Sequence, residues 1–235
     1  MSRLATLVLG SSLLVGCVAS DGAGDEGMYI QKAIATTADS CAFSSTDAEA
    51  FIGHGTIYVG SPNSYLLHPQ VKSRITTTSD LETTQKTIQI RGARVNLEFA
   101  DSEVGAAVPA AQKKFQSLFT GPLAPNGGIT DATFEVLPED ALASIFPLAE
   151  GNPRFETEVI AKVTVFGDLA GDEVTSQEFR FPITVCSDCV VNVMGACPMT
   201  ATGRQGNACN PYQDGVVDCC TTADGITCPG TVGQN

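Results

Sequence analysis

Residues 155–185 have the sequence FETEVIAKVTVFGDLAGDEVTSQEFRFPITV and decide the fold. Apolar side chains, with Thr157 as the exception, occupy every second position in two runs, 155–165 and 179–185. Such alternation is typical of strands that bury one face. Glycine and aspartate in residues 167–172 begin the connection between the two runs. The stretch therefore predicts an antiparallel hairpin. We place its second strand at an edge, or with a bulge, because Pro182 cannot donate a backbone hydrogen bond.

Shorter alternating runs extend this pattern on the N-terminal side of the hairpin. They predict strands at 55–59, 65–77 with a break at Pro69, 87–99 and 133–137. The phase of the run 87–99 slips at Gly92, which indicates a β-bulge. One helix is expected to begin at Pro138 and to stop at Pro147. We predict a mainly β body over residues 41–185: an antiparallel, immunoglobulin-like β-sandwich with one short helix.

The N-terminal residues 1–17, MSRLATLVLGSSLLVGC, form a basic start followed by an apolar run too short to span a bilayer. Residues 14–17 resemble the lipobox of bacterial lipoproteins, in which Leu, a small or β-branched residue and Gly or Ala precede the lipid-accepting cysteine. The resemblance implies cleavage after residue 16 and acylation of Cys17 with fatty chains such as palmitate. The alternative is an ordinary secretory signal with an incidental cysteine.

Residues 17–40 are rich in small and polar residues and are interpreted as a flexible, lipid-anchored tether, in which residues 28–34 can dock as an edge strand. The residue after Cys17 is Val18. By the sorting rule of the lipoprotein family, the absence of Asp at this position favours the outer membrane. We therefore expect a protein of the cell envelope, anchored in the outer membrane through its lipid.

Residues 186–235 form a cysteine-rich tail that needs crosslinks to become ordered. Its seven cysteines and Cys41 make eight, which allows 105 pairings. We expect the adjacent Cys219 and Cys220 to have different partners. Cys41 is expected to pair with Cys186 or Cys189, the alternative being a free or intermolecular thiol. The disulfide candidates are Cys41, Cys186, Cys189, Cys197, Cys209, Cys219, Cys220 and Cys228.

The whole arrangement resembles uncharacterised cysteine-rich lipoproteins known from myxobacteria. The residues that carry the resemblance are the strand and Cys-x-x-Cys of 181–189, FPITVCSDC, and the tail segment 209–220, CNPYQDGVVDCC. The resemblance implies a lipobox, a β-rich body and a cysteine-rich tail, and it implies no activity.

Three kinds of chemistry compete with structural disulfides in the tail. The Cys-x-x-Cys of 186–189 has the spacing of a redox dithiol, but an extended run follows it in place of the helix that such a site needs. Zinc would need a second close pair of ligands. Calcium has weak candidates in Asn210, Asp214 and Asp218, which resemble part of a thrombospondin type 3 repeat without its run of aspartates. We expect no cofactor, with calcium as the alternative.

Composition narrows the class of function. The net charge of −13 argues against nucleic acid as a partner. The sequence contains no G-x-S-x-G, H-E-x-x-H or P-loop motif, and only His54 and His68 are candidate bases near neutral pH. We interpret the chain as a non-enzymatic binding or structural module that faces an envelope protein or glycan. The alternative is an exported hydrolase with a carboxylate-based site.

Overall fold

The computed structural model describes residues 27–35, 51–79, 85–198, 203–207, 209–223 and 225–228. Cys17, Cys41 and most of the proposed tether lie outside these residues. The described part is mainly β, as predicted. Its strands are β1 (Met28–Ile34), β2 (Phe51–Ile52), β3 (Gly55–Tyr58), β4 (Tyr65–Leu67), β5 (Pro69–Ser73), β6 (Ile88–Phe99), β7 (Lys114–Leu123), β8 (Ile129–Asp131), β9 (Phe134–Leu137), β10 (Glu156–Leu169), β11 (Asp172–Thr175), β12 (Phe179–Cys186), β13 (Val191–Ala196), β14 (Val217–Thr222) and β15 (Gly225–Thr227). Its helices are α2 (Ser102–Ala107), α3 (Ala110–Lys113) and α4 (Glu139–Ala149).

The predicted hairpin is the centre of a six-stranded sheet with the order β3-β12-β10-β6-β7, in which β11 also pairs with β10. β10 and β12 are antiparallel, with Ala161 opposite Phe181. The prediction that β12 lies at an edge or bulges at Pro182 is wrong, because β3 pairs with it on the other side and its register with β10 continues through Pro182 without a shift. β3 begins opposite Ile183, so Pro182 lies just beyond the end of β3.

The bulge predicted at Gly92 is confirmed. The register between β6 and β7 shifts between Ile90 and Gly92, and the register between β6 and β10 shifts at Phe166. A Cβ atom on Gly92 would overlap the carbonyl oxygen of Ser117 on β7. Glycine is therefore required here because another backbone comes too close for a side chain.

A four-stranded sheet has the order β2-β1-β5-β8. The prediction of an edge strand within the tether is corrected, because β1 pairs with β2 on one side and with β5 on the other. The physical reason is burial: Met28, Ala33 and Ile34 are almost fully shielded from solvent. Burial of these apolar side chains stabilises β1 inside the sheet, although the residues before it are small and polar.

The described residues contain three helices where one was predicted. α2 begins after Asp101, whose carboxylate accepts a hydrogen bond from the backbone N–H of Glu103, as an N-cap does. α4 was predicted, but Pro147 does not end it. The helix continues to Ala149, because proline in the last turn removes only one hydrogen bond.

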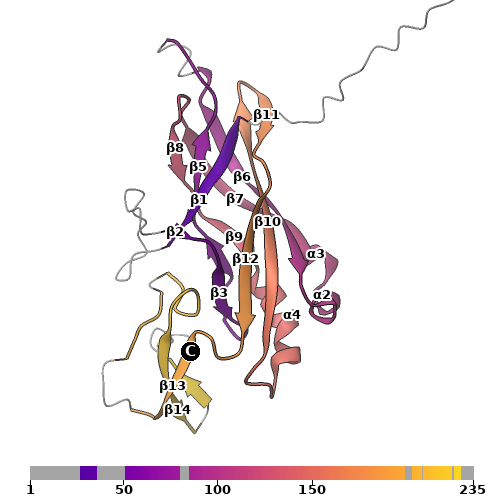
Figure 1. The fold of residues 1–235 in the computed structure, drawn as a ribbon, viewed down its shortest axis with the longest axis vertical. Helices are drawn as coiled ribbons and strands as arrows, with labels where there is room; N and C mark the ends of the chain where they lie inside the picture. The colour runs from indigo at the N-terminus through magenta and orange to yellow at the C-terminus, as the bar shows by residue number, and fades with distance from the viewer. Residues whose placement is uncertain are drawn as a thin grey trace, which may run out of the picture.

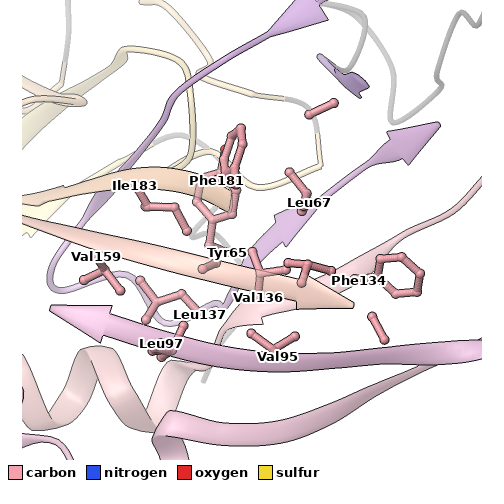
Figure 2. Packing of buried hydrophobic residues seen from close by; sticks show 14 of the residues in the cluster. Tyr65, Leu67, Val95, Leu97, Phe134, Val136, Leu137, Val159, Phe181 and Ile183 are labelled. Carbon is pink, nitrogen blue, oxygen red and sulfur yellow. The ribbon is translucent and has the colours of Figure 1, made fainter. Parts of the chain in front are cut away.

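The two larger sheets share one hydrophobic core. In Figure 2 the buried side chains of β4, β6, β9, β10 and β12 point toward one another. Tyr65 is fully buried, with its ring centroid 5.9 Å from that of Phe181. Burial of each large apolar side chain contributes about 1.5–3 kcal/mol. This core holds the sheets as a rigid support for the outer faces.

The prediction of a purely antiparallel body is wrong at β3, and the tail, for which no strand was predicted, also contains a parallel pair. β3 runs parallel to β12, and in the tail β13 runs parallel to β14, with β15 completing a separate three-stranded sheet. Both parallel pairs join segments that are far apart in sequence, which a hairpin pattern cannot reveal. No helix among the described residues is long and apolar enough to cross a membrane.

The first described strand, β1, begins at one end of the body, and the tail lies at the opposite end (Figure 1). At one end Met28 bridges to Ser176, beside β11. At the other end Glu156 lies opposite Cys186, from which the tail continues. Ser176 hydrogen-bonds to Val165, and the distance along β10 from there to Glu156 is about 30 Å at ~3.3 Å per residue.

Candidate functional site

The tail docks on the end of the body through polar side chains of residues 210–214, of which Asn210 and Gln213 are buried. Asn210 Nδ2 donates to the carbonyl oxygen of Ser64 at 3.0 Å. The Gln213 side chain accepts from the N–H of Leu66 at 2.9 Å and donates to the Leu66 carbonyl at 2.7 Å. Gln213 therefore satisfies both backbone groups of one β4 residue, as a neighbouring strand would.

Asp214 is the centre of this junction. Its carboxylate accepts from the Tyr65 hydroxyl at 2.6 Å, from the Thr56 backbone N–H at 2.7 Å and from Gln213 Nε2 at 3.1 Å. Burial raises the pKa of Asp214, while these hydrogen bonds oppose the rise. Its backbone has a φ of 54°, a left-handed conformation that is uncommon outside glycine. Sequence reasoning missed the pairing of Tyr65 with Asp214, since 149 positions separate them.

A hollow of about 290 Å³ lies beside the junction, and His54, Asp214 and Cys189 are among its lining residues. His54 Nε2 lies 3.0 Å from Thr184 Oγ1. The structure thus places one of the two candidate bases in the same hollow as the hydrogen-bonded carboxylate of Asp214. His68 is far less accessible: it is buried with its Nδ1 3.0 Å from Thr133 Oγ1, and burial lowers its pKa to about 4.

The three weak calcium candidates hydrogen-bond to protein groups at two different places. Asn210 and Asp214 take part in the docking contacts. Asp218 instead accepts hydrogen bonds from Arg204 Nη2 at 2.7 Å and from Asn192 Nδ2 at 2.6 Å. The hydrogen bonds from Arg204 hold the pKa of Asp218 well below its usual range. Within the described ranges, no three His, Cys, Asp or Glu side chains form a group that could hold a metal ion.

Six tail cysteines lie in three pairs at disulfide distance. Their Cα atoms are 5.7 Å apart in Cys186–Cys189, 5.1 Å in Cys197–Cys220 and 4.2 Å in Cys219–Cys228. The adjacent cysteines at 219 and 220 therefore have different partners, as predicted.

The expected bond from Cys41 to Cys186 or Cys189 is wrong, because those two cysteines pair with each other across a short turn. Cys209 is also disulfide-bonded. Cys17 and Cys41 lie outside the described residues.

The outer face of the six-stranded sheet carries the second candidate site, which we call the polar lattice. Its members come from β6, β7 and β10 with one residue of β12, and the strand register aligns them in two rows across the strands. The first row is Lys114, Asn96, Lys162 and Arg180, and the second is Gln116, Arg94 and Thr164. These residues face away from the core, because their neighbours along each strand point inward.

Acidic partners hold part of the polar lattice in place. Glu98 forms ion pairs with both Lys162 and Arg180, the latter at 2.7 Å. The hydrogen bond from Lys162 is the main cause that lowers the pKa of Glu98. Arg94 Nη2 contacts both carboxylate oxygens of Glu173, at 2.9 and 2.8 Å. These exposed pairs add little stability, but they orient the cations on the face of the sheet.

Four members of the polar lattice have side chains without a partner in the described part of the chain. Among the described residues, no hydrogen bond or ion pair reaches the side chain of Asn96, Lys114, Gln116 or Thr164. All four line a hollow of about 400 Å³ over β6, β7 and β10. Unpaired donors and acceptors on rigid strands are available to a ligand.

Sequence reasoning missed the polar lattice because β7 was hidden in the stretch 100–130. Ser117 and Gly121 occupy buried positions of β7, where an alternating pattern would show apolar residues. The available signal was incomplete: Phe115, Phe119 and Leu123 lie on one face of β7 but recur only at every fourth position. No family model, curated protein or solved structure matches this chain.

Proposed function

We propose that this chain is a lipid-anchored protein of the cell envelope, in which a non-enzymatic β-rich body presents a binding surface to an envelope partner. Cys17 in its lipobox-like context would carry the anchor, and Val18 favours the outer membrane. We also propose that the two sheets around the shared core form an immunoglobulin-like sandwich, since aligned sheets of this kind bury one common core.

One observation carries the proposal: the chain enters the fold at the end opposite the tail (Figure 1). An anchor at Cys17 would hold the β11 end of the body toward the membrane. The polar lattice would then lie along the side of the body, and the docked tail would lie at the distal end. Both surfaces would stay open to a partner outside the membrane.

Membrane fractionation tests the anchor. Cys17→Ser is expected to move the protein from the membrane fraction to the soluble exported fraction and to abolish labelling by radioactive palmitate. Ser20→Ala is the matched control, because it changes a residue of the same segment outside the lipobox and should leave labelling and fractionation unchanged. Membrane retention of the Cys17→Ser protein would overturn the proposal.

An exported hydrolase is the second candidate, because His54 and Asp214 line the same hollow. The hydrogen bonding favours a structural role instead: three donors already occupy the Asp214 carboxylate, which leaves it poorly placed as a general acid or base. A turnover activity of the purified protein that His54→Ala abolishes, without loss of folding, would favour the hydrolase.

A further inference from the structure

We infer that the polar lattice binds an acidic glycan, a sugar chain rich in hydroxyl groups that carries carboxylates. This inference rests on the proposed role as a binding module but does not depend on the lipid anchor. Three features carry it: the chemistry of the unpaired side chains, their spacing, and the charge of this face relative to the rest of the chain.

The unpaired side chains match sugar hydroxyls. Asn96 and Gln116 each offer two donors and an acceptor, and Thr164 offers a hydroxyl. A planar amide can bond to two neighbouring hydroxyls of one sugar ring. Lys114 adds an ammonium group, which prefers a charged acceptor such as a carboxylate. The set is therefore suited to a polar chain with at least one acidic group.

The spacing follows from the sheet. Neighbouring strands are about 4.8 Å apart, so each row of the polar lattice presents a polar side chain at a step comparable to the length of one pyranose ring. The first row offers Lys114, Asn96, Lys162 and Arg180 in order across four strands. A glycan that lies across the strands would therefore place about one sugar over each strand. Each sugar could then contact the lattice side chains of that strand.

Charge distinguishes this face from the rest of the chain. The protein has 13 basic and 26 acidic residues, yet the first row holds three cations and no acid. Glu98 and Glu178 neutralise much of the charge of Lys162 and Arg180 and leave Lys114 free of any ion pair among the described residues. A negative group of the ligand would pair best with Lys114.

A protein partner fits the polar lattice less well. Strong protein interfaces place large apolar anchors in pockets at their centre. Here the centre is polar, and the one aromatic residue that lines the hollow, Phe115, is half-buried. β6, β10 and β12 have neighbours on both sides, so a peptide could add as a further strand only beside β7, at the end of the sheet and away from Thr164 on β10.

Isothermal titration calorimetry with the purified full-length protein tests the inference. The probes are hexagalacturonate as the acidic glycan, maltohexaose as the neutral glycan and hexaglutamate as the acidic peptide. We expect hexagalacturonate to bind more tightly than either of the others, and its affinity to fall as salt is added.

Two variants and one control locate the site. Lys114→Ala should weaken hexagalacturonate binding roughly 10-fold or more, and Asn96→Ala with Gln116→Ala should weaken it by a similar factor. Lys72→Ala removes the same charge from the other sheet and should change nothing. Circular dichroism of each variant confirms folding.

Four outcomes would overturn the inference: no binding of hexagalacturonate, equal binding of maltohexaose, equal or tighter binding of hexaglutamate, or an equal loss in Lys72→Ala. A failed Cys17→Ser fractionation would instead overturn the anchor alone, because binding in solution needs no lipid.

Discussion

Replacing Tyr65 by Phe tests how the tail is held on the body. The substitution keeps the buried ring and its contact with Phe181, and it removes only the hydroxyl that donates to Asp214 at 2.6 Å. A hydrogen bond to a charged group contributes about 1.5–3 kcal/mol. We expect the free energy of unfolding to fall by about that amount at neutral pH, and the melting temperature to fall by roughly 2–4 °C per kcal/mol.

The loss should depend on pH in a defined direction. Burial raises the pKa of Asp214 in the folded state, so its ionisation opposes folding: the stability linked to this group is present below its unfolded pKa and is lost as pH rises through its folded pKa. The Tyr65 hydrogen bond lowers that pKa, and removing it will raise the pKa further. The difference between the two proteins should therefore be largest near pH 7 and smallest near pH 4, where a neutral carboxyl loses a bond worth only about 0.5–1.5 kcal/mol.

Urea unfolding followed by far-ultraviolet circular dichroism, with the disulfides kept oxidised, measures both effects. Tyr58→Phe is the control, because no hydrogen bond to the hydroxyl of Tyr58 exists among the described residues. A loss below about 0.5 kcal/mol at pH 7, or a loss that is the same at pH 7 and pH 4, would refute the reasoning.

Two further predictions concern the β-bulge and the disulfides. Gly92→Ala should lower the free energy of unfolding by about 1–3 kcal/mol in urea titrations, because the new methyl group would overlap the carbonyl oxygen of Ser117. Gly53→Ala is the control and should lower it less, because a Cβ atom there meets only ordinary van der Waals contacts. Equal losses in the two variants would contradict the explanation. The other six tail cysteines pair among themselves, so we expect the partner of Cys209 to be Cys41, across a loop of about 170 residues that would stabilise the fold by about 5 kcal/mol. Non-reducing peptide mapping checks this bond, and a Cys41 peptide recovered as a free thiol would disprove it.

Local patterns predicted the elements whose signal is complete within a few residues. The central hairpin, the strand over 88–99 and its bulge at Gly92 follow from side-chain alternation, because a half-buried strand repeats every two residues. The strand within residues 100–130 was missed because the prediction relied on this same alternation. In β7 the buried positions hold Ser117 and Gly121, so the pattern that marks a strand is broken although the backbone pairs normally with β6.

The candidate sites could not be predicted from local patterns, because each is made by residues that only folding brings together. Tyr65 and Asp214 belong to the body and the tail, and neither has a neighbour in sequence that reveals the contact. The rows of the polar lattice exist only through strand register, where a shift of one residue would turn Lys114 and Asn96 toward the core.

The sequence by itself determined that the body is mainly β and that a cysteine-rich tail follows it, because both depend on composition and short-range period. The lipid anchor stays a prediction. The tertiary structure alone decided which cysteines pair, which strands become neighbours and which polar side chains keep partners. The physical reason is that these contacts depend on how buried apolar faces stack. Many different pairings satisfy the same alternation, and only packing of the whole core selects one of them.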